Sequence, residues 1–335
     1  ILRHFENAIR MGKISHAYII NGEEGSGKMN LAIHFAKALQ CERNNSNKAI
    51  NEDGERITVP GTACGQCKSC KQTDSKNQPD IKYITYEKSG IGVDEIREQI
   101  NDDIDIKPYS SPYKIYIVPE SEKMTVQAQN ALLKTIEEPP EYAIIILLTT
   151  NADTFLQTIL SRCVMLNIRP VKEDIIKNQL TSQYGVGDYE ARVAATFSNG
   201  NPGKAIKLAT SEEFKELKQY VVGMFMSLEK GGMDIIGEAI KKTGTFKKQI
   251  DEYFSLMRIW FRDILVYKAT KEEDQIIFQD EYMTIEKMSQ TYSFDDINDI
   301  LKAIDLAESR IKSNVNFDST IEILLLSIKE KTSGK

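Results

Sequence analysis

A glycine-rich loop ending in lysine is the first segment of the chain with the residues to do chemistry. It reads Gly-Glu-Glu-Gly-Ser-Gly-Lys over residues 22–28, between an apolar run at 17–21 and a helical pattern at 28–40. In this strand–loop–helix setting, glycines let backbone N–H groups wrap a phosphate, and the lysine adds positive charge at the helix N-terminus. The pattern therefore favours a phosphate loop over a glycine-rich turn that only resembles one. The expected phosphate-binding residues are Gly22, Gly25, Gly27 and Lys28.

The residues that would bind Mg²⁺ beside such a loop are replaced. After the lysine, the motif has a Ser or Thr whose hydroxyl binds the metal, but this chain has Met29, and a thioether is a poor ligand for a hard cation. The second ligand is an Asp at the end of a later strand, and Pro119 stands there. Glu120 follows, but a carboxylate without a metal-bound nucleotide cannot complete hydrolysis. The sequence therefore predicts no intrinsic ATPase activity and leaves nucleotide binding itself open.

A cluster of cysteines predicts a metal site. Three of the five cysteines form a C-x-x-C-x-x-C pattern, and a fourth precedes them with 22 residues between. Four thiolates fit tetrahedral Zn²⁺ in a closed, structural site, and Gly65 permits a tight turn between ligands. An iron–sulfur centre and unligated thiols stay as alternatives, although no Cys-Pro follows and the fourth cysteine is distant in sequence. The expected zinc ligands are Cys41, Cys64, Cys67 and Cys70.

The elements that position these residues follow from hydrophobic patterning. Continuous apolar runs predict buried strands of a parallel sheet covered on both faces, and helical patterns alternate with them, so the fold class is α/β. The expected strands are 17–21, 81–85, 114–118, 143–149 and 163–168, and the expected helices are 28–40, 93–103, 125–138 and 154–160.

Strand signals end at Pro170, and only helical patterns follow. Short helical segments continue to about residue 210, and longer helices follow from 212. Apolar residues recur in the longer helices at spacings of three and four. On this spacing Phe254, Trp260 and Phe261 are core residues. We expect three domains: an α/β domain over 1–168 with a zinc module at 41–71, a small helical lid over 169–210, and an all-helical domain over 211–335.

Composition excludes several classes of protein. The 335 residues are 41% hydrophobic and 27% charged, which is ordinary for a soluble globular protein, and no apolar stretch reaches the ~18 residues of a membrane span. A net charge of −6 argues against a protein that holds nucleic acid mainly by its own charge. Clustered cysteines favour a reducing cytoplasm over a secreted disulfide scaffold. Because the chain begins without a Met, we expect a short N-terminal piece to precede it.

Four passages together resemble one family. They are Lys-Ile-Ser-His-Ala-Tyr at 13–18, the four cysteines, Ala-Gln-Asn-Ala-Leu-Leu-Lys-Thr-Ile-Glu-Glu-Pro-Pro at 128–140, and Ser-Arg-Cys at 161–163. They resemble the delta-prime family of bacterial DNA polymerase III clamp-loader subunits, whose members are AAA+ proteins. The resemblance is dense over residues 13–165. Beyond that range, only the helical character of the segments and their order along the chain match the family.

This resemblance implies a non-hydrolysing stator subunit. In the family, a five-membered assembly held together by helical collar domains loads a ring-shaped sliding clamp onto primed DNA during DNA replication. The implied partners are the gamma/tau and delta subunits, the clamp and primed DNA within a cytoplasmic hetero-oligomer, with no membrane. Arg162 of the Ser-Arg-Cys motif is implied to act as an arginine finger in a neighbour's ATP site. Gly203 stands where hydrolysing relatives have the sensor 2 arginine, and Lys204 beside it would substitute only after a backbone shift.

Three other functions compete with this reading. An ATP-hydrolysing gamma/tau-type subunit shares most of the motifs, but the replacements at Met29, Pro119 and Gly203 oppose it. A freestanding nucleotide kinase needs an acceptor site and a metal ligand, and the sequence shows neither. A zinc-dependent nucleic-acid-binding module would use Lys68 and Lys71, but acidic residues surround them, and mixed charge is typical of a solvated loop.

Overall fold

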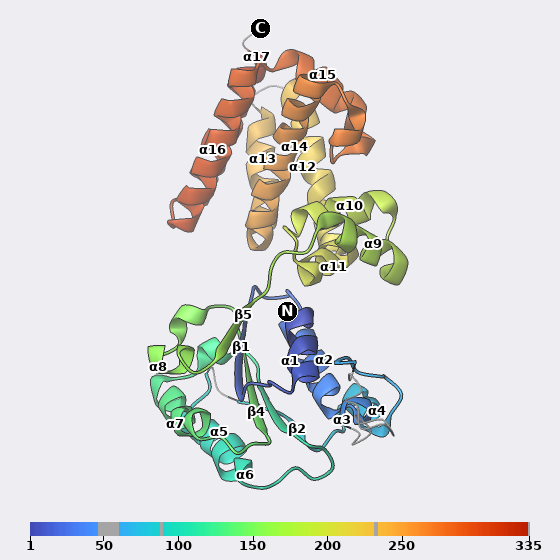
Figure 1. Ribbon diagram of the computed structural model, residues 1–335. Coiled ribbons are helices and arrows are strands. Elements are labelled where there is room, and N and C mark those ends of the chain that lie inside the picture. The colour runs from blue at the N-terminus through green and yellow to red at the C-terminus, as the bar shows by residue number, and fades with distance from the viewer. Residues whose placement is uncertain (46–59, 88–89, 231–233, 334–335) are drawn as a thin grey trace. The chain divides into compact units, whose positions relative to one another are not determined.

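The structure is a computed structural model that describes residues 1–45, 60–87, 90–230 and 234–333. The chain forms two compact units, Ile1–Pro170 and Val171–Lys335 (Figure 1). Residues 46–59 of the expected zinc module lie outside the described residues.

A five-stranded parallel sheet forms the centre of the first unit, in the order β2-β3-β4-β1-β5. The register pairs Ile19 of β1 with Leu147 of β4 on one side and with Met165 of β5 on the other. All five predicted strands are confirmed, although two are shorter than expected. Their bounds are β1 Ala17–Asn21, β2 Ile81–Tyr83, β3 Lys114–Val118, β4 Ala143–Thr149 and β5 Val164–Asn167.

Helices cover both faces of this sheet, which explains why its strands are continuously apolar. Alternate residues of β1 point to opposite faces: Tyr18 and Ile20 join one core cluster, whereas Ala17 and Ile19 join another. The first cluster includes residues of α1 (Leu2–Met11) and α2 (Lys28–Gln40), and the second includes residues of α5 (Val93–Ile96) and α7 (Val126–Glu137). Figure 1 shows these two pairs of helices on opposite sides of the sheet.

The helices of the first unit differ from the prediction in two places. The segment expected at 93–103 is helical but contains a π turn, Arg97–Asn101, between α5 and α6 (Asp102–Ile104). The helix expected at 154–160 is reduced to α8 (Gln157–Leu160), preceded by a 3₁₀ turn at Ala152–Thr154. The cause is a side-chain contact: Gln129 Oε1 accepts the N–H of Leu156 at 2.8 Å, which holds residue 156 in an extended conformation.

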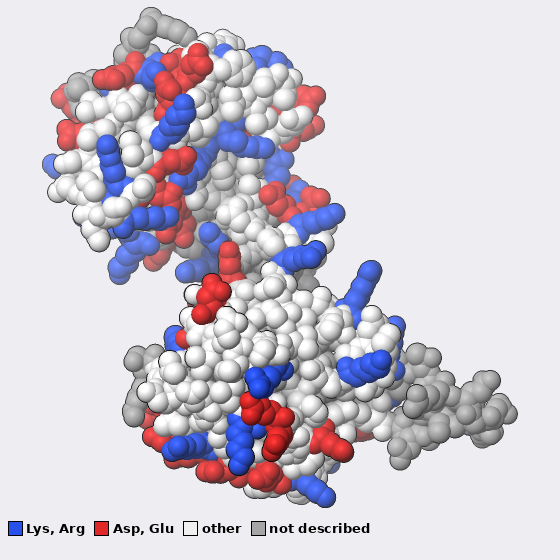
Figure 2. Space-filling model, turned by 60° about the vertical axis from the view of Figure 1, so that its left-hand side comes forward, with Lys and Arg blue, Asp and Glu red and all other residues white. Residues whose placement is uncertain are grey.

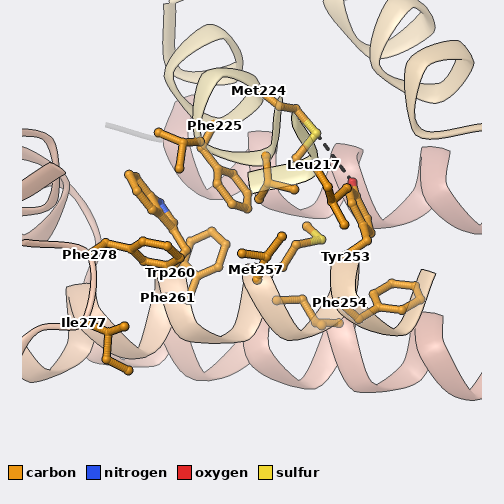
Figure 3. Packing of buried hydrophobic residues seen from close by; sticks show 14 of the residues in the cluster. Leu217, Met224, Phe225, Tyr253, Phe254, Met257, Trp260, Phe261, Ile277 and Phe278 are labelled. Carbon is orange, nitrogen blue, oxygen red and sulfur yellow. Dashed lines mark hydrogen bonds between the residues drawn. The ribbon is translucent and has the colours of Figure 1, made fainter. Parts of the chain in front are cut away.

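The second unit is entirely helical in its described part, and one hydrophobic cluster runs through it from Ile176 to Ile328. Figure 3 shows Trp260 and Phe261 meeting Phe225 of a neighbouring helix, with ring centroids of Trp260 and Phe225 5.7 Å apart. The predicted burial of Phe254, Trp260 and Phe261 is confirmed. The expected domain boundary near residue 210 stays a prediction. The helices are α9 Glu173–Tyr184, α10 Asp188–Phe197, α11 Pro202–Thr210, α12 Glu212–Lys230, α13 Asp234–Thr245, α14 Ile250–Thr270, α15 Tyr282–Thr291, α16 Phe294–Lys312 and α17 Phe317–Ser333.

The surface carries both signs of charge. On the face drawn in Figure 2, the described basic and acidic side chains are interspersed rather than gathered into a basic track. This distribution agrees with the acidic net charge and gives no electrostatic footprint of a nucleic-acid groove on that face. None of the described helices is long and apolar enough to span a lipid bilayer.

Candidate functional site

The phosphate loop connects the end of β1 to the start of α2, as the sequence predicts. Gly25 and Gly27 have φ values of 78° and 89°, in the left-handed region that side chains rarely adopt, so glycine is required at both turns. Lys28 Nζ donates hydrogen bonds to the carbonyl oxygens of Gly22, at 2.6 Å, and Glu23, at 2.8 Å. These two bonds leave one N–H of the ammonium group for a further acceptor, such as a phosphate oxygen.

The surroundings of Lys28 are acidic. Burial lowers the pKa of Lys28, while the nearby carboxylates of Glu122, Glu24 and Glu23 act in the opposite direction. Mg²⁺ ordinarily offsets the charge of a bound triphosphate. A polyphosphate that enters this loop therefore meets three carboxylates beside the ammonium group of Lys28, in addition to the backbone N–H groups of the loop.

Neither expected metal-ligand position offers an oxygen atom from its side chain. Met29 lies in the first turn of α2, and its side chain packs against the apolar cluster beneath that helix. Pro119 directly follows β3. Hard divalent cations bind oxygen ligands, and neither a thioether nor a pyrrolidine ring supplies one. The geometry therefore agrees with the sequence in placing no protein Mg²⁺ ligand at these two positions.

Glu120, the carboxylate next to Pro119, is bound by two neighbouring side chains. Its Oε1 lies 2.8 Å from Lys123 Nζ, and its Oε2 accepts a hydrogen bond from the hydroxyl of Tyr86. The contacts with Lys123 and Tyr86 lower the pKa of Glu120. Sequence analysis missed both partners. The three-residue spacing of Glu120 and Lys123 was an available signal, whereas Tyr86 is brought there by the tertiary fold.

The four predicted zinc ligands come together, with their Sγ atoms all within 4.8 Å of one another. Cys41 caps the C-terminus of α2, and Cys67 caps the N-terminus of α4 (Lys68–Asp74), which also carries Cys70. The Sγ atoms of Cys64 and Cys70 are 3.9 Å apart. Zn–S bonds of about 2.3 Å in a tetrahedron place two sulfurs about 3.8 Å apart. The donor set therefore fits one zinc ion with four thiolate ligands.

Backbone N–H groups support the sulfur atoms. Cys64, Cys67 and Cys70 each donate an N–H bond of 3.4 Å to the Sγ of the preceding cysteine in the cluster. N–H groups of Gln66 and Cys67 lower the pKa of the Cys64 thiol to about 6, whereas burial raises the pKa of Cys41 and Cys70. Cys64 is therefore a thiolate at neutral pH, and the buried thiols would release protons as metal binds.

Arg162 lies between α8 and β5, at the edge strand of the sheet, as the sequence predicts. Its guanidinium donates to the carbonyl oxygen of Thr158 at 3.0 Å and forms a 3.0 Å ion pair with Glu137. The side chain is 41% exposed. An exposed guanidinium at the edge of the unit is accessible to another molecule. Sequence analysis missed Glu137 as the partner because the two residues belong to different elements.

Gly203, the position considered for sensor 2, lies in the first turn of α11. Asn201 caps this helix by accepting the N–H of Lys204 at 3.1 Å. The cap fixes Lys204 as part of the first helical turn, so the backbone shift that would place its side chain at position 203 requires breaking the cap.

A parallel sheet with a phosphate loop after β1, an inserted cysteine cluster and a following helical unit defines an AAA+ protein. The family model of the DNA polymerase III delta subunit matches residues 1–172, and that of its C-terminal region matches residues 237–330. The chain belongs to this family, in which it is similar over its length to delta-prime subunits.

Two curated relatives and one solved structure illustrate what the chain is similar to. DNA polymerase III subunit delta' of Bacillus subtilis is 26% identical over 334 residues, which cover 98% of this chain and 95% of that protein. Subunit tau of the same organism is 33% identical over 213 residues, 62% of this chain but only 35% of tau. A solved gamma subunit-related protein from Thermotoga maritima is 22% identical, covers 99% of both chains and has a TM-score of 0.42.

Proposed function

We propose that this chain is a non-hydrolysing subunit of a DNA polymerase III clamp loader, and that it supplies Arg162 to the ATP site of a neighbouring subunit. The observation that carries the proposal is a contrast within one unit. The chain's own site has Met29 and Pro119 at the metal-ligand positions, whereas Arg162 is exposed at the edge of the sheet.

Catalysis of phosphoryl transfer depends mostly on positioning and charge stabilisation around a metal-bound nucleotide. With Met29 and Pro119 in place, this chain lacks both protein contacts to Mg²⁺. Glu120 is hydrogen-bonded to Lys123 and Tyr86, and these contacts lower its pKa and so weaken it as a base for water. These features support the proposal that the chain's own phosphate loop does not hydrolyse ATP.

The proposed role of Arg162 concerns ATP hydrolysis in the neighbour. There, a water oxygen bonds to the γ-phosphorus, the bond to the β–γ bridging oxygen breaks, and ADP, phosphate and a proton leave. Negative charge spreads over the γ-phosphoryl oxygens in the transition state. A planar, permanently charged guanidinium suits that charge, and such fingers contribute roughly 10³–10⁵ in rate in other phosphoryl-transfer systems.

The zinc site is proposed to be structural. Cys41, Cys64, Cys67 and Cys70 fill four tetrahedral positions, so no position is left for a reacting water. The metal would fix the segment between α2 and α4 against the α/β unit, because structural zinc is coupled mainly to the folding of the segment it closes.

The proposed partners are the gamma/tau and delta subunits of the same machine, and through the complex the sliding clamp and primed DNA. Two relatives support this: a delta' subunit over 98% of this chain, and a tau subunit over 62% of it. The helices after α11 are proposed to form the collar through which the subunits assemble.

The test is reconstitution. The purified chain is mixed with gamma/tau and delta subunits, and size-exclusion chromatography followed by ATP turnover is measured with each protein alone and together. Co-elution with no turnover by the isolated chain is the expected result. Failure to co-elute would contradict the proposal, and turnover by the isolated chain would favour a hydrolysing gamma/tau-type subunit instead.

A further inference from the structure

The ion pair between Arg162 and Glu137 joins two elements of the first unit. Glu137 is the last residue of α7, and its Oε1 lies 3.0 Å from Nη2 of Arg162. Both side chains are about half exposed, at 45% for Glu137 and 41% for Arg162. The pair is therefore at the surface, where solvent weakens it as a source of stability.

The helix that carries Glu137 is anchored at several points. In the preceding residues of α7, Ile136 is buried and Thr135 Oγ1 donates to Asn101 Oδ1 at 2.9 Å. Gln129, two turns earlier in the same helix, accepts the N–H of Leu156 and so joins α7 to the segment that enters α8. Glu137 thus lies at the end of an anchored helix, and the segment that leads through α8 to Arg162 is hydrogen-bonded to the same helix.

The guanidinium of Arg162 is only partly satisfied by these contacts. Nη1 donates to the Thr158 carbonyl at 3.0 Å and to Ser161 Oγ at 3.3 Å, and Nη2 bonds Glu137. A guanidinium has five N–H groups in a rigid fork. The Nε–H and one Nη2–H therefore have no acceptor among the described residues, and they are free to bind oxygens of another molecule.

We propose that Glu137 positions Arg162, holding one side of the guanidinium so that its remaining N–H groups are presented outward to the neighbour's ATP. This inference rests on the function proposed above. A long arginine side chain loses much rotamer freedom when it is ordered, and an acceptor already in place removes part of that cost before the neighbour docks. Glu137 does not touch the ATP in this account and is a positioning residue.

The experiment uses the reconstituted complex and measures ATP hydrolysis stimulated by clamp and primed DNA. Subtracting the rate of the Arg162→Ala complex from the wild-type rate gives the component that depends on Arg162. Glu137→Ala should lower that component about two- to fivefold, the range typical of an exposed ion pair. The effect should fall on kcat rather than KM, because the finger acts in the transition state. Glu137→Gln should retain more of the rate than Glu137→Ala, because its amide oxygen still accepts a hydrogen bond.

Two controls separate positioning from a structural role. Glu138→Ala removes the neighbouring exposed carboxylate, which is not among the described hydrogen-bond or ion-pair partners of Arg162, and should leave the rate unchanged. In the Arg162→Ala background, Glu137→Ala should have no further effect, since coupled residues are not additive. An equal loss in both backgrounds, or a faster rate in the single variant, would overturn the inference. If Arg162→Ala itself has no effect, the proposed function fails; if only Glu137→Ala has none, the positioning role alone fails.

Discussion

Glu120 and Lys123 form an ion pair just beyond strand β3, with 2.8 Å between Oε1 and Nζ. The hydroxyl of Tyr86 donates to the other carboxylate oxygen. Both oxygens of this carboxylate have a partner within the chain, and the contacts with Lys123 and Tyr86 lower its pKa, which makes it a weaker base. Together with Met29 and Pro119, this arrangement supports the proposal that the chain's own phosphate loop does not hydrolyse ATP.

The first prediction is that the purified chain does not hydrolyse ATP. No protein ligand for Mg²⁺ exists at positions 29 and 119, and catalysis of phosphoryl transfer depends on the positioned metal. Phosphate release measured with and without Mg²⁺ should equal the background, and Lys28→Ala should give the same value. Magnesium-dependent turnover that disappears in Lys28→Ala would contradict the prediction, whereas weak nucleotide binding without turnover would not.

The second prediction is one zinc ion per chain. Protein purified without chelator should contain about one equivalent by metal analysis, because four thiolates close the site. Cys67→Ala should lose the metal and unfold the segment around the cluster while the sheet stays folded, as seen by local hydrogen exchange. Iron with a visible charge-transfer band, or a metal-free protein, would be the contrary finding.

The pH dependence of zinc binding has a definite sign. The pKa of the Cys64 thiol is lowered to about 6, so this ligand is ionised above that pH and protonated below it. Since protons and zinc compete for all four thiolates, zinc affinity should fall as the pH is lowered below the raised pKa values of Cys41 and Cys70, and should fall more steeply below about 6, where Cys64 is also protonated. A competition titration against a chromophoric chelator measures this, and an affinity independent of pH between 5 and 7 would argue against thiolate ligation.

The sequence predicted the sheet well because a parallel sheet buried on both faces requires apolar residues at nearly every position. It also placed Arg162 and the four cysteines, since these depend on local spacing and on the end of one helix. It missed Tyr86 and Glu137 because both act through partners more than 20 residues away, which only tertiary packing brings together. The later start of α8 also involves a distant partner, because Gln129 accepts the N–H of Leu156, the extended residue that precedes the helix.

The third prediction concerns a largely buried ion pair at the N-terminal end of β3. Lys114 in β3 is only 4% exposed, and its Nζ lies 2.8 Å from Asp103 Oδ2. Lys114→Met removes the more buried of the two cations beside Asp103 and leaves Lys82 in place. The free energy of unfolding should therefore fall by about 1–3 kcal/mol, less than the roughly 3–5 kcal/mol that an unpaired buried charge costs. Lys82→Met removes the more exposed partner of the same carboxylate and should cost about 0–1 kcal/mol. Denaturant unfolding of the two variants checks the difference, and equal losses would refute it.

The fourth prediction is a loss of stability in acid that depends on Asp103. Burial opposes ionisation of this carboxyl group, but hydrogen bonds from Lys114, Lys82 and Tyr116 outweigh it and lower its pKa. A group with a lowered pKa stabilises the fold above its ordinary value, about 3.9, and that contribution disappears as pH falls through the lowered value. The free energy of unfolding of the wild type should therefore fall more steeply below about pH 4 than that of Asp103→Asn. Parallel slopes would show that this carboxyl group is not linked to folding.

The account as a whole depends on what Arg162 does in the assembled complex. The measurement is the rate of ATP hydrolysis by the reconstituted clamp loader, stimulated by clamp and primed DNA, with wild type, Arg162→Ala and Arg162→Lys compared at equal zinc content and assembly. We predict that Ala removes the contribution of the one site facing this subunit and slows clamp loading. Lys should rescue poorly because it lacks the planar fork. An Ala complex that assembles normally and hydrolyses ATP at the wild-type rate would show that Arg162 is an ordinary surface residue.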